Sequence, residues 1–265
     1  MNKLLQDFNE SFRYTSERSR LGLTMAVAQA DEALYALVSG EAPAVIGDVV
    51  AVMQRIDALL ANDDGLKWFN RMYLMVTQAV DLHPPDGGWK DADWLLALDV
   101  VFAGFYLRAI AGYLSGDETV PVSWQVLMEA RYTPGIDRIQ FAVAGMNAHI
   151  NHDLALALLA TDAQKNVIPS SGSPQYADYQ AVNSLLNTLT PSVLTMLATD
   201  VLGVLAQDTG KVGRLLAFWD ICKARNLAWG FADHLRGLTG PARIIAMNAQ
   251  DQMTGVIGRA ILALR

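Results

Sequence analysis

The sequence predicts an all-α protein that folds as a single multi-helix bundle of about nine to eleven helices. Apolar residues recur at the 3.6-residue spacing of an amphipathic helix in nearly every segment, whereas no two segments alternate as paired strands would. Clusters of Gly, Pro, Asn and Asp separate the segments. With 265 residues, of which 52% are hydrophobic, the chain can bury one large core.

Helix-capping and helix-breaking residues set the boundaries of the predicted helices. Gly40 ends the second helix, residues 62–65 (Asn-Asp-Asp-Gly) end the third, and Pro121 starts the sixth. Residues 83–88 (His-Pro-Pro-Asp-Gly-Gly) form a loop. The expected helices are 4–12, one that ends at 38, 43–60, 66–82, 91–115, 121–131, 136–161, 175–189, 191–207, 211–237 and 241–264.

No internal repeat and no shift in composition marks a second domain. We therefore expect residues 1–265 to form one domain, in which N-terminal helices within 1–65 pack on a core formed by 66–240. The longest irregular stretch, rich in Ser, Gly and Pro, falls within 162–175, where we expect a flexible lid loop. The apolar helix over 244–264 is suited equally to packing within the chain and to forming a homodimer.

Charge and cysteine content exclude several classes of function. The net charge is −7 and Lys and Arg form no cluster, which argues against a nucleic-acid partner. The single cysteine, Cys222, allows no intramolecular disulfide and fits a reducing compartment. The first residues do not resemble a signal peptide, and polar residues interrupt the longest apolar runs, such as 193–205. We expect a cytoplasmic protein without stable membrane insertion.

The most informative stretch is 145–154, Gly-Met-Asn-Ala-His-Ile-Asn-His-Asp-Leu. It places two Asn, two His and one Asp in an otherwise apolar helix, and burying an unpaired polar group costs about 1–3 kcal/mol. On a helical wheel, Asn147 and Asn151 lie at one edge of the apolar stripe, and His149 and Asp153 lie at the opposite edge. His152 points away from the stripe.

This spacing predicts two pairs with different chemistry. His149 and Asp153 are four residues apart, so the carboxylate can bond the imidazole, fix its tautomer and raise its basicity, as a general base requires. The alternative is an interior histidine that only satisfies hydrogen bonds between helices. The amides of Asn147 and Asn151 would bind a polar group of a substrate or bond the backbone of a neighbouring helix.

A metal site is the competing interpretation of the same stretch, because His149, His152 and Asp153 are all potential ligands. Helical spacing of two ligands is common, however, and no Glu-x-x-His pair completes a bundle-type site. The chain also contains no phosphate-binding loop, no dinucleotide fingerprint and no Gly-x-Ser-x-Gly nucleophile motif. We therefore expect neither a metal nor another cofactor.

Further candidate residues lie outside the central stretch. Asp99, in an apolar run with Tyr106, must be paired with an arginine such as Arg71, Arg131 or Arg225, or else be exposed or protonated. Arg225 and Trp229 are one helical turn apart and suit an arginine–aromatic stack. Asp178 either contacts a substrate or stabilises the first turn of a helix.

Four segments together resemble an uncharacterised, mainly bacterial family, the domain of unknown function 5995. They are 145–154, 98–106 with Asp99, Phe102 and Tyr106, 178–183 (Asp-Tyr-x-x-Val-Asn) and 224–229 (Ala-Arg-x-x-Ala-Trp), in the expected order over about 70–230. In that family the position of His152 is usually apolar, so the resemblance argues against a family-wide ligand role for His152. It implies a helical fold and supports the candidate residues, but it implies little about activity.

Three functional hypotheses follow. The first is an enzyme that converts a hydrophobic small molecule by cyclisation, isomerisation, elimination or hydrolysis, with His149 and Asp153 as acid–base groups. The expected substrate-binding residues are Asn147, Asn151, Asp99, Tyr106, Arg225, Trp229 and Asp178, and the expected apolar lining is Phe102, Phe105, Tyr106, Trp124 and Trp229. The second is a metal-dependent hydrolase or oxygenase, and the third is a non-catalytic helical binding or assembly protein. A cavity beside His149 would favour an enzyme, whereas a closed core would favour the third hypothesis.

Overall fold

The computed structural model of the chain describes residues 25, 27–198 and 220–264, and the structural statements below refer to these residues. They contain helices and no strand, which confirms the all-α prediction. Residues 27–38 are helical. The elements that follow are α2 (Ile46–Leu59), α3 (Gly65–Leu82), α4 (Ala92–Ser115), α5 (Val122–Ala130), α6 (Arg138–Ala148), the π-helical turn η1 (His149–Asp153), α7 (Leu154–Lys165), α8 (Pro174–Leu197), α11 (Ile221–Arg236) and α12 (Gly240–Ala263).

Aspartate side chains fix several helix starts. Asp64, Asp91 and Asp220 accept hydrogen bonds from backbone N–H groups in the first turns of α3, α4 and α11. The predicted start of the third helix at residue 43 is wrong by three residues. There, Asp48 accepts the N–H groups of Ala44 and Val45, so the helix begins only at Ile46.

Two predicted boundaries around α8 are also wrong. α8 continues through Pro191 instead of breaking there; the proline is exposed, and the helix tolerates the one backbone bond it lacks. α7 extends to Lys165 and ends at Asn166, which adopts a left-handed conformation, so 162–165 are helical and the loop shrinks to 166–173. The predicted helix at 4–12 and the parts of predicted helices within 199–219 lie outside the described residues.

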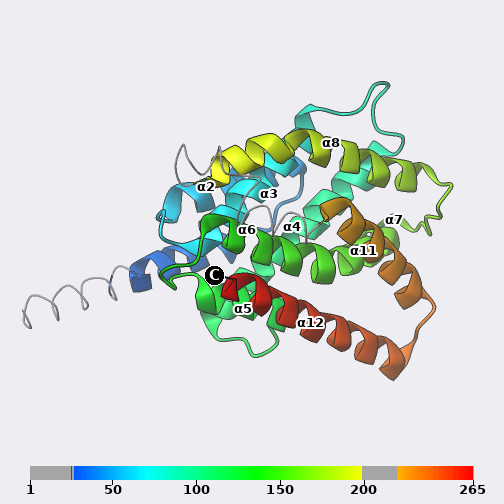
Figure 1. Cartoon of the computed structure of the whole chain (residues 1–265). Helices are drawn as coiled ribbons and strands as arrows, with labels where there is room; N and C mark the ends of the chain where they lie inside the picture. Colours follow the sequence, from blue (N-terminus) through cyan, green and yellow to red (C-terminus); the bar gives the residue numbers. More distant parts are fainter. Residues whose placement is uncertain (1–24, 26, 199–219, 265) are drawn as a thin grey trace, which may run out of the picture.

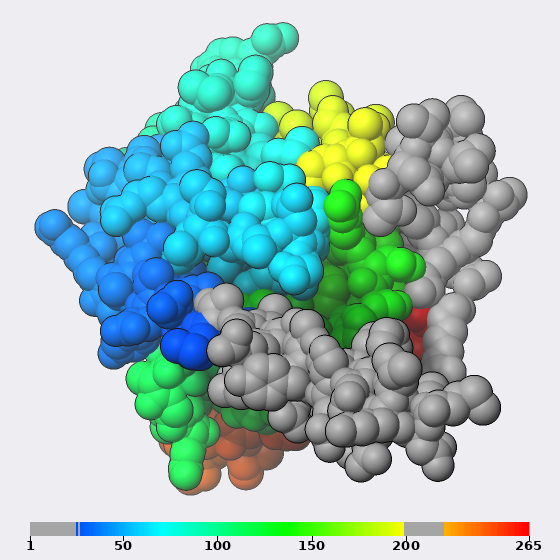
Figure 2. Space-filling view, turned by 90° about the vertical axis from the view of Figure 1, so that its left-hand side faces the viewer, coloured from blue at the N-terminus to red at the C-terminus, as the bar shows by residue number. Residues whose placement is uncertain are grey.

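The continuous run α6–η1–α7 crosses the middle of the molecule (Figure 1). α8 lies on one side of this run, and α12 with α5 lies on the other. α4 and α11 pack against η1 and α7. On the face shown in Figure 2, the N-terminal helices in blue lie against the cyan surface of α3. The polar stretch predicted from the sequence is therefore surrounded by helices.

α4 contributes much of the apolar surroundings of this stretch. By length and composition it is the one described helix that could cross a membrane. Within the fold, its residues Leu98, Phe102 and Tyr106 are buried in the core. These side chains face the central run of helices, because α4 packs against η1.

Gly145 permits the close approach of α3 to α6. A Cβ atom at this position would stand 2.4 Å from Cγ of Phe69, which is closer than carbon atoms pack in proteins. The absent side chain thus leaves room for the Phe69 ring one turn before His149.

Candidate functional site

The site is built on a wide helical turn. The N–H of Leu154 donates to the carbonyl of His149, five residues back, which is the bond of a π-helix. Because this turn holds more residues than an α-helical turn, a wheel drawn at 100° per residue places the residues after His149 wrongly. His152 was predicted to point away from the core; in the structure it is buried and bonds Asp153. Single π-turns inside α-helices often occur at functional sites.

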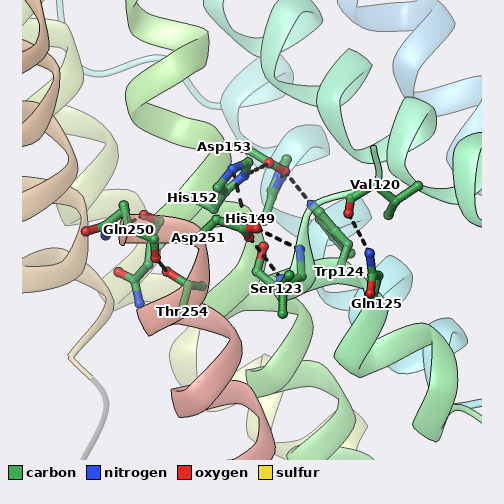
Figure 3. Close-up of polar contacts among 12 residues, drawn as sticks. Val120, Ser123, Trp124, Gln125, His149, His152, Asp153, Gln250, Asp251 and Thr254 are labelled. Atoms are coloured by element: carbon green, nitrogen blue, oxygen red, sulfur yellow. Dashed lines mark hydrogen bonds and ion pairs between the residues drawn. The ribbon is translucent and has the colours of Figure 1, made fainter. Parts of the chain in front are cut away.

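Asp153 is the centre of the polar cluster shown in Figure 3. Its Oδ2 lies 3.0 Å from Nδ1 of His149 and accepts the indole N–H of Trp124 at 2.9 Å. Its Oδ1 lies 2.7 Å from Nδ1 of His152. Burial raises the pKa of this carboxyl, but the hydrogen bonds and charges of the two histidines outweigh burial and hold the pKa below its usual value. Asp153 is therefore an ionised carboxylate shared by two imidazoles, and the predicted His149–Asp153 contact is confirmed.

His149 lies inside a box of aromatic rings and is only 1% exposed. Phe102 stacks on the imidazole with the ring centroids 3.5 Å apart and the planes 7° from parallel, and Tyr73 lies edge-on at 4.5 Å. The remaining walls are Phe69, Tyr106 and Trp124, at 5.7, 6.2 and 5.9 Å. Burial lowers the pKa of His149, and the hydrogen bond and charge of Asp153 oppose this only in part. The imidazole is consequently neutral at pH 7.

The hydrogen bonds of His149 assign its tautomer. A neutral imidazole carries one N–H, and a carboxylate can only accept, so the proton belongs on Nδ1 facing Asp153. Nε2 then carries a lone pair. That nitrogen is buried and has no hydrogen-bond partner among the described residues.

Oη of Tyr73 and Oδ2 of Asp99 are also buried near this box and lack hydrogen-bond partners among the described residues. Asp99 lies one helical turn before Phe102. Burial raises the pKa of Tyr73, and the carboxyl of Asp99, when ionised, adds to this effect. Burial raises the pKa of Asp99 to about 7, against the opposing charge of Arg225. Of the three states predicted for Asp99, a carboxyl that is protonated near neutral pH fits best.

The arginines predicted as partners of Asp99 are engaged elsewhere. Arg71 pairs with Asp57, and Arg131 pairs with Asp64 and Asp31. No ion pair within 4.0 Å joins Asp99 to a described cation. Of the three states considered for Asp99, pairing with an arginine is therefore one that the described part of the chain does not show.

The two asparagines bond a neighbouring helix and each other. Nδ2 of Asn147 donates to the carbonyl of Thr254 in α12, at 2.8 Å, and Nδ2 of Asn151 donates to Oδ1 of Asn147 at 2.9 Å. Gln250 of α12 donates to the backbone carbonyl of Asn151. This geometry matches the second predicted role of these amides, hydrogen bonding between helices.

Only some of the predicted lining residues, including Tyr106, contact His149. Tyr106 is a fully buried wall of the box, and its hydroxyl donates to Oδ1 of Asn70 at 3.2 Å. Burial raises the pKa of Tyr106 above its usual value. Phe102 and Trp124 also face His149, whereas Phe105 lies under the guanidinium of Arg108.

Asp178, Arg225 and Trp229 form a separate cluster. Asp178 accepts the backbone N–H groups of Lys90 and Asp91 at 2.8 and 2.7 Å, and so secures the start of α4. Arg225 donates to Oδ1 of Asn183 and to the carbonyl of Tyr179, and its guanidinium stacks over the Tyr179 ring at 4.2 Å. Trp229 packs against the rings of Tyr176, Tyr179 and Trp94. No hydrogen bond or ring contact joins these three residues to His149 or Asp153 in the described part of the chain.

Comparison with known protein families places this arrangement in a known group. The model of the family of unknown function DUF5995 matches residues 46–264. The chain belongs to DUF5995. No curated protein and no solved structure matches it. The match spans more of the chain than the 70–230 expected from the sequence motifs.

In the described part of this DUF5995 protein, the potential metal ligands of the central stretch do not converge on a common point. The described residues hold no group of three or more His, Cys, Asp or Glu side chains that could bind a metal ion. Both imidazoles direct Nδ1 at Asp153, so the potential ligands face one another.

The cavities in the described part of the DUF5995 chain include four of about 290 to 420 Å³, and His149 lines none of these four. One of about 410 Å³ lies close by, between α3, α6 and α8. Its mainly aliphatic lining includes Met72, Val76, Val143, Met146, Leu194 and Leu197. Met72, which lines this cavity, is adjacent in the chain to Tyr73 of the box. Met146, which also lines it, precedes His149 by three residues. The cavity and the box are therefore lined by neighbouring residues of the same helical segments.

Sequence reasoning missed Tyr73, Phe69 and Asp251 at this site. The i,i+4 spacing of Phe69 and Tyr73 was a signal that one aromatic face of α3 points inward. Asp251 lies almost a hundred residues after Asp153, and no local pattern links the two.

Proposed function

We propose that this protein is an enzyme that converts a hydrophobic small molecule by proton transfer at His149. The observation that carries the proposal concerns Nε2 of His149, which is buried in an aromatic box and has no hydrogen-bond partner among the described residues, while Nδ1 bonds an ionised carboxylate. Cyclisation, isomerisation, elimination and hydrolysis all use such a group as general base or acid.

The surroundings of His149 suit a base. Its Nε2 is buried, so the lone pair is shielded from bulk solvent, and the imidazolium that forms on proton uptake lies 3.0 Å from Asp153. Trp124 and His152 hold the carboxylate in place before the reaction, so little reorganisation accompanies the proton transfer.

Two buried polar side chains near the box support a substrate with a polar group. Tyr73 and protonated Asp99 would donate hydrogen bonds to a carbonyl or a developing oxyanion. The aliphatic cavity between α3, α6 and α8 would hold the apolar remainder of the molecule. Tyr73 and Phe102 are each 7% exposed, whereas Phe69, Tyr106 and Trp124 are 0% exposed. We therefore expect a substrate to enter the box past Tyr73 and Phe102.

A test uses proton exchange, which needs no knowledge of the natural substrate. The purified protein is incubated in D₂O with a panel of hydrophobic cyclic ketones, and deuterium incorporation next to the carbonyl is followed by mass spectrometry. We expect exchange that falls by about 10²–10⁴-fold in His149→Gln. The matched control, His234→Gln on the exposed end of α11, should leave exchange unchanged. Exchange that survives in His149→Gln contradicts the proposal, as does a ¹⁵N NMR spectrum in which Nε2 of His149 carries the proton.

A second candidate function is a non-catalytic binding or assembly protein whose polar cluster fixes helix packing. It is favoured by the closed box, because His149 is only 1% exposed and lines none of these four cavities. A purely structural network satisfies its members, however, and this one leaves Nε2 of His149 without a partner among the described residues, with unpartnered buried oxygens of Tyr73 and Asp99 near the same box. Under this alternative, diethyl pyrocarbonate modifies the exposed His83 and His234 of the native protein and never His149. Slow modification of His149 would instead show that the box opens.

A further inference from the structure

The polar cluster does not end at the His149–Asp153 pair. It continues from Asp153 to His152 and on to Asp251 of α12, whose Oδ1 lies 4.0 Å from Nε2 of His152 (Figure 3). His149 and Asp153 are almost completely buried, whereas the side chain of Asp251 is 14% exposed. The cluster therefore leads from the aromatic box to the edge of the protein.

Asp251 also forms hydrogen bonds with the start of α5. Its Oδ2 accepts the backbone N–H of Val122 at 2.8 Å and its Oδ1 accepts that of Ser123 at 3.0 Å, at the start of α5. The next residue is Trp124, which bonds Asp153. These contacts form a closed circuit. Asp251 of α12 bonds the start of α5, Trp124 of α5 bonds Asp153, and Asp153 bonds His152, which lies beside Asp251.

The surroundings shift the pKa values of His149 and His152 in opposite directions. Burial lowers the pKa of His152, but the hydrogen bond and charge of Asp153, together with the charge of Asp251, outweigh burial and raise the pKa above its usual value. Burial dominates for His149 and lowers its pKa. A first proton taken up by the pair therefore resides on His152. Its positive charge then offsets Asp153 and leaves His149 neutral.

The charged groups around this pair come from two elements. Asp153 lies in η1 itself and acts on both imidazoles, and Asp251 reaches His152 from α12. From α4, α6, α7 and α11, which also pack against η1, no described carboxylate comes within 4.0 Å of either ring.

We propose that His152 is a positioning residue for His149, and that its protonation, supported by Asp251, sets how strongly the shared carboxylate holds a proton on His149. When His152 is cationic, its charge offsets part of the charge of Asp153. His149 is then less basic and remains neutral. When His152 is neutral, Asp153 acts on His149 alone and His149 becomes more basic. The use of this control in catalysis rests on the proposed function of His149, whereas the coupling itself is a property of the folded protein.

NMR titration of the histidine ring signals tests the coupling in the full chain without a substrate. The chain has four histidines, so single substitutions assign every signal. In the wild type, the His149 signal should show a second inflection at the midpoint of His152. His152→Asn keeps a side-chain N–H donor near the position of Nδ1 but removes the charge. We expect it to raise the midpoint of His149 by about one pH unit.

Two further variants separate charge from packing. Asp251→Asn should lower the midpoint of His152, because a neighbouring negative charge is lost, and His234→Asn should change neither midpoint. The proposal is overturned if His149 titrates at the same pH in His152→Asn and in the wild type. If His152→Asn does not fold, a His149 signal without an inflection at the His152 midpoint overturns it equally. Because no activity is measured, failure of this test is distinct from failure of the exchange assay with His149→Gln.

Discussion

Replacing Gly145 with alanine tests how the aromatic box is assembled. Gly145 is buried in α6, one turn before His149, and Phe69 of α3 packs directly on its backbone. A methyl group there would stand 2.4 Å from Cγ of Phe69 and 2.6 Å from its Cβ and Cδ2. Since Cβ itself is too close, rotation of the ring cannot relieve the clash, and the backbones of α3 and α6 must separate.

The magnitude follows from two opposing effects. Excess volume in a packed core costs about 1–3 kcal/mol, and a clash that moves backbone belongs at the upper end. Phe69 has little room to retreat, because the rings of Tyr106 and Trp124 lie 5.1 and 5.4 Å from its own. Alanine in place of glycine inside a helix returns about 0.5–1 kcal/mol. The net expectation is a destabilisation of about 2 kcal/mol, or a Tm about 4–8 °C lower.

The control is Gly230→Ala in α11, where a Cβ atom would meet nothing within 4 Å and the position is exposed. This variant receives the helix-propensity gain alone, about 0.5–1 kcal/mol, and its Tm should rise. Thermal unfolding followed by circular dichroism at 222 nm compares the two. A Gly145→Ala protein that melts at or above the wild-type temperature would refute the packing of Phe69 against α6 and, with it, this wall of the box.

Two further substitutions probe the polar groups of the site. Trp124→Phe removes the indole N–H that bonds the Asp153 carboxylate, so the free energy of unfolding in urea should fall by about 1.5–3 kcal/mol. A decrease below about 0.5 kcal/mol would mean that Asp153 does not depend on this donor. Burial raises the folded-state pKa of Asp99 to about 7, above an unfolded value of about 3.9, so between these values the folded state holds a proton that the unfolded state has lost. Wild-type stability should therefore fall relative to Asp99→Asn as the pH rises from about 4 to about 7, and level off above. The same stability difference between the two proteins at pH 4.5 and pH 8 would contradict the raised pKa.

Much of the secondary structure could be predicted because its causes are local. The 3.6-residue period, the capping aspartates and the Gly-Pro loops act within a few residues of one another, and the helices from α3 to α5 begin and end within one residue of the predicted positions. The wrong boundaries of α2 and α8 also have local causes, which the predictions did not take into account. Asp48 delays the start of α2, and the exposed Pro191 is tolerated inside α8.

The candidate site was predictable only in part. The i,i+4 spacing of His149 and Asp153 predicted their contact, which needs nothing beyond one helix. The role of His152 was predicted wrongly, because the π-turn that directs it inward does not follow from an apolar period measured at 100° per residue.

The sequence by itself determined that the chain is helical, where most of its helices lie, and that His149 meets Asp153. Tertiary structure decided what surrounds that pair. The box draws Phe69 and Tyr73 from α3 and Phe102 from α4, and Trp124 and Asp251 reach the cluster from α5 and α12. These residues are far apart in the chain, and which helix faces meet depends on close packing of side chains such as Phe69 on Gly145, a fit that no local pattern records.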